Sequence, residues 1–320
     1  MKIVIIDSFA LIHRVYHALP NFTTSSGEPS GAVYGFCSTF LKVLQKFNPD
    51  HVCAAFDDGS KPTFRKELAP LYHANRPEKD ASMIAQIEVI KDFLRAMNIP
   101  IYIAPGFEGD DVIGTLAYRF SSQENAEIII LTGDYDTLQL VNKTTCVFTM
   151  RKGITDTILF DENAVHEKYG FDPAFLPDYK ALMGDPSDNY GGVPGIGPKT
   201  AQMLIMRFKT VENVYAYLTE SEEGQALGDV LPAPLEIKLK AGKEDAFLSK
   251  KLAVIRKDVP LDIDLTSENY PVGVTQAARD FFEQMGFSSL LKRVDSGNGK
   301  DHPMKKKIVK SSKPALRLFD

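Results

Sequence analysis

The first 131 residues alternate short apolar runs typical of β-strands with longer amphipathic runs typical of helices. This alternation is the strongest constraint on the fold, because strands separated by helices favour a parallel sheet covered on both faces. The expected strands are KIVII, HVCAAF, IPIYIA and EIIIL, and the expected helices span 31–47, 81–97 and 109–120. We therefore expect an α/β fold.

Nine carboxylates lie where apolar runs end: Asp7, Asp57, Glu108, Asp110, Asp111, Asp134, Asp136, Asp185 and Asp188. One such Asp is ordinarily a turn residue or a helix N-cap. Here five segments carry them, and the ends of parallel strands meet at one edge of a sheet. Clustered carboxylates repel one another unless cations neutralise them, and oxygen ligands suit Mg²⁺ or Mn²⁺. The pattern predicts a site for two metal ions acting on a phosphodiester.

Composition sets the outer limits. With 320 residues and 44% hydrophobic content, the chain can bury a full core in one large domain plus a smaller one, or in two domains. No signal peptide or transmembrane run is evident, so a soluble protein is expected. Cys37, Cys53 and Cys146 are odd in number and widely spaced, which favours free thiols in the cytoplasm over disulfides or a zinc site.

The net charge of −5 is unusual for a protein that binds nucleic acid. Residues 295–320 carry seven Lys/Arg and three Asp, so the charge of the remaining chain is near −9. Nine acids of that remainder are the expected metal ligands, whose charge bound ions would cancel locally. Overall acidity therefore neither excludes nor supports a basic track for DNA.

Two further regions differ from the alternating pattern. Residues 60–82 are charged and aromatic and contain Pro62, Pro70 and Pro77, which suits a mobile arch over a site. After about residue 175 helical patterns dominate, and a helical subdomain is expected over 176–294.

The segment GGVPGIGPKTAQMLIMRF (191–208) joins glycine-rich turns to a helix that begins near Pro198. Backbone amides and the helix N-terminus of such a hairpin can hold a phosphate, and its carbonyls can ligate a monovalent cation such as K⁺. The alternative is an ordinary Gly/Pro turn before an amphipathic helix. Contact through the backbone would hold DNA of any sequence.

Three segments in this order resemble the bacterial 5′-nuclease family: GFEGDDVIGTLA (106–117), LTGDYDTLQL (131–140) and GDPSDNYGGVPGIGPKTA (184–201). The family includes the N-terminal exonuclease domain of DNA polymerase I and stand-alone flap endonucleases, and the likeness runs from Met1 to about Val294. It implies a PIN-like core over 1–175 with parallel strands, a helical arch, a helix-hairpin-helix subdomain over 176–294, and cleavage of 5′ flaps and 5′ ends of DNA in primer removal and repair.

The resemblance also implies roles for single residues. Asp7, Asp57, Glu108, Asp110 and Asp111 would hold or support one metal, and Asp134, Asp136, Asp185 and Asp188 would hold or orient the other. The DNA contacts of the hairpin would come from Gly192, Val193, Gly195, Ile196, Gly197, Lys199 and Thr200.

In the arch, Phe64, Arg65, Tyr72, His73 and Arg76 match the family's FR…YKxxR segment. Tyr72 would stack on a terminal base, and Arg65 and Arg76 would grip phosphate. The alternative is that these residues only solubilise an exposed helix. His73 stands where the family has a lysine that contacts the scissile phosphate, so either cleavage is slower and more pH-sensitive or another lysine replaces it (Lys66 or Lys79).

Residues 295–320 are expected to form a disordered basic tail. The tail ends in ALRLFD, which resembles a motif that docks on the sliding clamp, with Ala315 in place of the usual Gln.

Together these features predict a cytoplasmic, monomeric, metal-dependent 5′ nuclease that lacks a polymerase domain and works beside a separate polymerase. Two alternatives stay open. A PIN-type ribonuclease is disfavoured by the hairpin, and a non-catalytic DNA-junction-binding protein by the presence of all nine acids.

Overall fold

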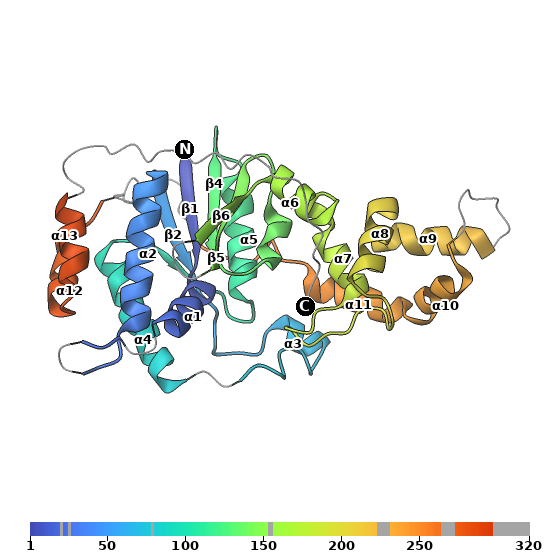
Figure 1. Cartoon of the computed structure of the whole chain (residues 1–320), viewed down its shortest axis with the longest axis horizontal. Helices are drawn as coiled ribbons and strands as arrows, with labels where there is room; N and C mark the ends of the chain where they lie inside the picture. Colours follow the sequence, from blue (N-terminus) through green and yellow to red (C-terminus); the bar gives the residue numbers. More distant parts are fainter. Residues whose placement is uncertain are drawn as a thin grey trace.

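The computed structural model describes residues 1–19, 22–24, 27–77, 80–152, 156–222, 231–263 and 273–296. Within them one six-stranded sheet has the order β3-β2-β1-β4-β5-β6 (Figure 1). Strands β1 to β5 are parallel, and β6 runs antiparallel to β5. The strands are β1 (Lys2–Asp7), β2 (His51–Ala55), β3 (Ile101–Tyr102), β4 (Glu127–Thr132), β5 (Thr145–Lys152) and β6 (Asp156–Phe160).

Helices cover both faces of the sheet, and this explains why the four central residues of β1, Ile3 to Ile6, are all apolar. Ile3 and Ile5 pack into the core on one face, and Val4 and Ile6 pack into the core on the other. A strand buried on both faces reads as a continuous apolar run, as parallel strands do. The first core includes residues of α5 (Gly109–Phe120) and α6 (Glu162–Tyr169), and the second includes residues of α1 (Ser8–Ala18), α2 (Gly31–Phe47) and α4 (Ala81–Ala96).

Beyond β6 the chain is helical and extends away from the sheet (Figure 1). After α6 and the short 3₁₀ helix η2 (Pro173–Phe175), the helices are α7 (Leu176–Met183), α8 (Pro198–Phe208), α9 (Val211–Glu222), α10 (Ala233–Ala241) and α11 (Lys243–Ala253). A second 3₁₀ helix, η1 (Asp136–Leu140), lies between β4 and β5. Their buried side chains continue the core on the α5 side of the sheet.

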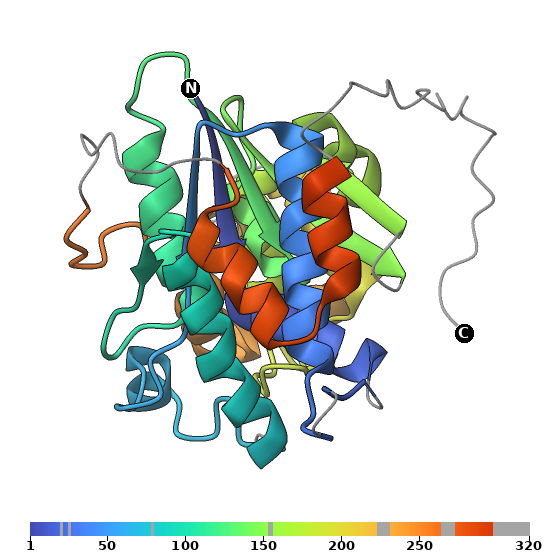
Figure 2. The same cartoon turned by 90° about the vertical axis from the view of Figure 1, so that its left-hand side faces the viewer.

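The last two described helices lie almost entirely within the expected subdomain of 176–294 but pack against the sheet domain. Helices α12 (Gln276–Gln284) and α13 (Ser288–Ser296) return to the sheet and pack beside α2 and α4 (Figure 2). Phe282 stacks on Phe93 with ring centroids 5.5 Å apart, and Arg293 donates to the Ser38 carbonyl at 3.1 Å. Their amphipathic pattern predicts helices with one buried face, but it does not say which surface covers that face.

The expected arch is less helical than predicted. In the arch segment, residues 60–77, the one described helix is α3 (Phe64–Leu68), and turns follow it to Arg76. Pro62, Pro70 and Pro77 limit helix length here, because proline lacks the amide that an interior helical position needs.

None of the helices in the described ranges is long and apolar enough to span a membrane.

Candidate metal centre and its cleft

A wide cleft lies at the carboxyl-terminal edge of the sheet, beside the arch segment, α7 and the start of α8. The eight expected acids that line it are Asp7, Asp57, Glu108, Asp110, Asp134, Asp136, Asp185 and Asp188. They come from the ends of β1, β2 and β4, the start of α5, η1, and the loop after α7. The fold thus brings together carboxylates that are up to 181 positions apart in the chain.

Local hydrogen bonds orient the acids that end the strands. Asp7 closes β1 and also caps α1, since its side chain accepts from the Ala10 amide at 3.0 Å and from the Thr132 hydroxyl at 2.5 Å. Asp57 accepts from the Gly109 amide at 2.6 Å. Asp7 is therefore the N-cap of α1 and also lines the cleft.

Burial and mutual repulsion disfavour the ionised forms of this part of the site. Burial raises the pKa of Asp7 to about 7, and the charges of Asp134 and Asp57 act in the same direction. Burial, followed by the charges of Asp134 and Asp7, also raises the pKa of Asp110 well above its usual value. A bound cation would relieve this repulsion.

A second group consists of Asp136, Asp185 and Asp188, each of which offers a carboxylate oxygen within 4.8 Å of the others. The Lys180 ammonium bonds to Asp136 and, at 2.5 Å, to Asp185. The Arg76 guanidinium donates to Asp188 at 2.7 Å. This group therefore contains carboxylates at ligand spacing together with two cations of the chain.

The cations separate the pKa values of the three acids. Burial raises the pKa of Asp136 to about 7 despite the opposing Lys180. Burial also acts to raise the pKa values of Asp185 and Asp188, but nearby cations outweigh it. Lys180 lowers the pKa of Asp185 below its usual value. The hydrogen bond from His73 and the charge of Arg76 lower the pKa of Asp188 to about 2.

Asp111 does not face the cleft, in contrast to its expected place among the ligands of the first metal. It is fully buried, and its two oxygens accept from the Arg65 guanidinium at 2.7 and 2.9 Å. The same oxygens accept from the backbone amides of Glu108 and Arg256. An acid saturated in this way has no free oxygen to offer an ion.

Two arch residues also differ from their expected roles. Arg65 is buried against Asp111, so its guanidinium is not exposed to a phosphate. Tyr72 lines the cleft but is only 3% exposed: its ring stacks on His73 with ring centroids 3.8 Å apart, and its hydroxyl donates to Glu108 at 3.1 Å, so other parts of the chain cover most of the ring. In the arch segment they stabilise the structure around Glu108, a role that composition alone does not reveal.

His73 and Arg76 do lie in the cleft. The His73 ring bonds to Asp188 at 3.1 Å through Nε2, and its Nδ1 lies 3.9 Å from Glu108. Its amide donates to the Asp188 carbonyl, and its backbone has a φ of 58°. The Arg76 side chain is 48% exposed, which leaves guanidinium donors available on the cleft side.

The hairpin between α7 and α8 divides into an interior and an exposed part. Val193 and Ile196 are buried in the core, and the buried Gly192 amide donates to the Ser249 hydroxyl at 3.2 Å. Exposed residues are Gly195, Gly197, which caps α8, and Lys199, which lines the cleft, while Thr200 is half-buried. Gly192, Val193 and Ile196, which were predicted to contact DNA, thus lie buried in the interior of the hairpin.

The structure adds cleft residues that the sequence interpretation missed. Lys180 is the most important, because it bonds to two of the acids. Arg14, His13 and Lys168 also line the cleft. A lysine or arginine on an amphipathic helix is typical of a solvent-exposed face, so no sequence signal singled these residues out.

Comparison with protein families gives two adjoining matches. The model described as "5'-3' exonuclease, N-terminal resolvase-like domain" matches residues 2–170, and "5'-3' exonuclease, C-terminal SAM fold" matches residues 171–276. DNA polymerase I of Bacillus caldotenax is 39% identical over 300 residues, which cover 94% of this chain and 33% of the relative. DNA polymerase I of Bacillus subtilis (strain 168) is 35% identical over 293 residues, 92% of this chain and 32% of the relative. The chain spans about a third of the length of these relatives.

Solved structures share the fold. A structure of T5 5′-exonuclease with bound divalent metal ions (zinc) has a TM-score of 0.62 at 21% identity and covers 92% of this chain and 98% of that one. The catalytic core of Rad2 in complex with DNA substrate has a TM-score of 0.56 at 17% identity, covering 92% of each chain. The family models and these structures confirm the predicted α/β class, a resolvase-like PIN-type sheet with a helical C-terminal region.

Proposed function

Because the chain belongs to the 5′-3′ exonuclease family, we propose that it hydrolyses phosphodiester bonds of DNA at 5′ flaps and 5′ ends. The observation that carries the proposal is the convergence of eight acids on one cleft, with Asp136, Asp185 and Asp188 at ligand spacing.

The donor set fits divalent ions. Its members are carboxylates, the hard oxygen ligands that Mg²⁺ and Mn²⁺ prefer. Burial, followed by the charges of neighbouring acids, raises the pKa values of Asp7 and Asp136, and bound cations would favour their ionised forms. Asp7, Asp57, Glu108 and Asp110 would hold or orient one ion, and Asp134, Asp136, Asp185 and Asp188 would hold or orient the other. When bound, such ions supply a more acidic water and neutralise charge at the scissile phosphate.

The chain's own residues position the substrate. Arg76, anchored on Asp188, presents its exposed donors to phosphate, and His73 lies beside it on the same carboxylate. The N-terminus of α8 and Lys199 bind the duplex backbone without reading its sequence. The hairpin carbonyls would also bind a monovalent cation such as K⁺ beside the duplex backbone.

We further propose a cytoplasmic monomer that removes primers beside a separate DNA polymerase. The free cysteines among the described residues agree with a reducing compartment. The clamp-docking motif ALRLF lies outside the described residues, so its support is the sequence alone.

One assay tests the central proposal: a labelled 5′-flap duplex and its RNA counterpart are incubated with Mg²⁺ or with EDTA. We expect Mg²⁺-dependent cleavage of the DNA flap. Asp185→Asn should lower the rate at least about 100-fold and leave flap binding nearly intact, because a ligand of the catalytic ion is lost. Asp92→Asn, an exposed acid on α4, serves as the matched control.

Other outcomes identify the alternatives. Cleavage of RNA alone would indicate a ribonuclease. Tight binding without cleavage under any divalent ion would indicate a junction-binding protein.

A further inference from the structure

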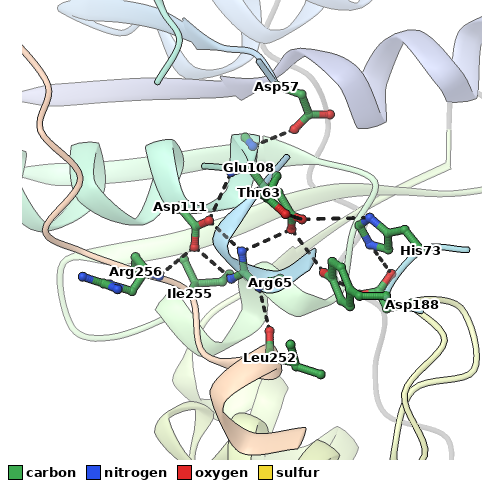
Figure 3. Close-up of polar contacts among 12 residues, drawn as sticks. Asp57, Thr63, Arg65, His73, Glu108, Asp111, Asp188, Leu252, Ile255 and Arg256 are labelled. Carbon is green, nitrogen blue, oxygen red and sulfur yellow. Dashed lines mark hydrogen bonds and ion pairs between the residues drawn. The ribbon is translucent and has the colours of Figure 1, made fainter. Parts of the chain in front are cut away.

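Arg65 is bonded at every N–H of its guanidinium. Nε donates to the Leu252 carbonyl at 2.8 Å, and Nη1 donates to Glu108 at 3.2 Å and to Asp111 at 2.7 Å. Nη2 donates to Asp111 at 2.9 Å and to the Val254 carbonyl at 3.0 Å. Five donors thus meet five acceptor atoms from two other segments of the chain, the start of α5 and the end of α11 with the residues after it. Figure 3 shows Arg65 between Glu108, Asp111 and Leu252.

Asp111 completes the cluster from α5. It lies at the third position of the helix, where it forms a reciprocal capping box with Glu108. Its Oδ1 also accepts from the Arg256 amide at 2.9 Å, which extends the cluster to the segment after α11. A buried acid with this bonding fixes the orientation of the start of α5, which carries Glu108 and Asp110.

The segment after α11, residues 254–259, is held close along α5. The Val259 amide donates to the Thr115 hydroxyl at 3.1 Å. A Cβ on Gly114 would lie 2.5 Å from the Arg256 carbonyl oxygen, so this approach requires glycine at position 114. Helix α11 in turn packs against α7, which leads directly to Asp185.

Each segment in the cluster leads to a different part of the cleft. The start of α5 carries Glu108 and Asp110, and the arch segment continues from Arg65 to His73 and Arg76. The segment after α11 belongs to the region that carries the hairpin. Fixing the three together therefore fixes carboxylates, arch and hairpin relative to one another.

On this geometry we propose that Arg65 and Asp111 are a pair of positioning residues that touch neither ion nor DNA and hold Glu108, Asp110 and the arch in register with the hairpin region. The proposal rests on the proposed nuclease function and deepens it, since it gives Asp111, expected among the ligands of the first metal, a role other than ligation.

Electrostatics separates this role from ligation. If Asp111 were a ligand, Arg65 would act only as a nearby positive charge, and removing that charge would strengthen binding of a divalent cation. If the pair positions the site, loss of either partner disturbs the same acids and weakens binding in both cases. The two roles therefore predict opposite signs for an Arg65 variant.

The experiment compares Arg65→Met, Asp111→Asn and the double variant Arg65→Met/Asp111→Leu, with Arg65→Lys as a conservative replacement. Arg119→Met, an exposed arginine on the same helix, is the control. Three quantities are measured: Ca²⁺ affinity by calorimetry, kcat and KM on a Mg²⁺-dependent flap substrate, and Tm. Ca²⁺ titration and Tm do not depend on turnover.

We expect both single variants to weaken Ca²⁺ binding and lower kcat by about 10- to 100-fold each, as loss of groups that orient metal ligands does. Their combined effect should be far from additive, and KM should change less than kcat. The double variant should regain Tm, because an apolar pair leaves no unpaired buried charge, but should not regain kcat. Arg65→Lys keeps one charge without the five-donor geometry and should recover Tm more than kcat; it also serves if Arg65→Met does not fold.

Two outcomes would overturn the proposal. Tighter Ca²⁺ binding in the Arg65 variants, with weaker binding only in Asp111→Asn, would make Asp111 a ligand. Recovery of kcat together with Tm in the double variant would make the pair a stabilising contact only. If the wild-type protein cleaves no nucleic acid, the proposed function fails, while Ca²⁺ affinity and Tm still decide the role of the pair.

Discussion

Single residues in the cleft show how one fold holds acids in two charge states. Lys180 and Arg76 keep Asp185 and Asp188 ionised, while burial keeps protons on Asp7 and Asp136 up to a pH near 7. Positively charged side chains thus compensate the charges of Asp185 and Asp188, whereas Asp7 and Asp136 depend on protons or on a bound metal ion.

A stability prediction follows from the raised pKa values. For Asp7 and Asp136 the folded-state pKa of about 7 exceeds the usual 3.8, so the folded state binds more protons than the unfolded state between these values. The stabilisation of the folded state by these protons is fully present below about pH 4 and is lost as pH rises through 7. Its size is about 1.4 kcal/mol for each unit by which the folded-state pKa exceeds the unfolded-state pKa. In EDTA, the Tm should be lower at pH 8 than at pH 5.5.

Two comparisons check this prediction by differential scanning fluorimetry. Ca²⁺ should raise the Tm more at pH 8 than at pH 5.5, because it binds the ionised carboxylates. Asp7→Asn should flatten the pH dependence in EDTA, whereas the exposed-site variant Asp92→Asn should not. A Tm in EDTA that rises from pH 5.5 to 8 would contradict the assigned direction.

The residues of the site were predictable to different degrees. Eight carboxylates that line the cleft stand in short motifs at the ends of apolar runs, and this local pattern is visible in the sequence. Asp111 stands in the same motif, yet its side chain points to Arg65 and not to the cleft. Lys180 carries no local signal, because its partners are set by the tertiary fold.

At the scale of elements, periodicity predicted the four strands β1 to β4 and the helices α2, α4 and α5 between them, but it missed α1. β5 and β6 were missed, although they extend the sheet at one edge. Their residues mix apolar and polar types, as in TCVFTMRK, so no continuous run marks them. The hairpin was recognised from its glycines, but which of its residues face inward depends on the packing of α7 and α11.

Gly192 provides a test of the hairpin as a packed element. Its φ is 60°, and an added Cβ would lie 2.3 Å from the Gly184 amide nitrogen, so both conformation and space require glycine. Gly192→Ala should lower the free energy of unfolding by about 2 kcal/mol or more and weaken duplex binding. Urea denaturation and a binding titration measure the two effects.

The neighbouring Gly191 is the matched control, since an added Cβ there meets no atom within 4 Å. Gly191→Ala should leave stability within about 1 kcal/mol of the wild type. Equal losses in the two variants would show that the hairpin does not depend on close backbone contact at Gly192.

At the scale of the whole molecule, α12 and α13 join the end of the described chain to the first half of the sequence. Their amphipathic pattern predicts helices, but the choice between covering the hairpin region and covering the sheet is made by complementary surfaces of α2 and α4. A boundary placed by sequence at residue 294 therefore includes a segment that packs elsewhere.

Phe282 tests this long-range packing. It is fully buried and stacks on Phe93, so Phe282→Ala should cost about 3–5 kcal/mol of stability through the cavity it leaves. The exposed Glu283→Ala is the control. Since α12 lies at the opposite end of the molecule from α8 and the hairpin (Figure 1), affinity for duplex DNA measured well below the Tm should be unchanged. A large loss of affinity without a loss of stability would place α12 in DNA binding.

The second group of acids spans the boundary between the two family matches, with Asp136 on one side and Asp185 and Asp188 on the other. A divalent ion that binds all three cross-links the two regions, so it should change the rate at which the backbone between them opens. The amides of Asp185 and Tyr190, which bond to each other's carbonyls, should exchange hydrogen more slowly with Ca²⁺ than in EDTA. The Val214 amide in α9, away from the acids, should show a smaller change. The catalytic ion would then also couple the local unfolding of the two regions, so that they open and close together while the ion is bound.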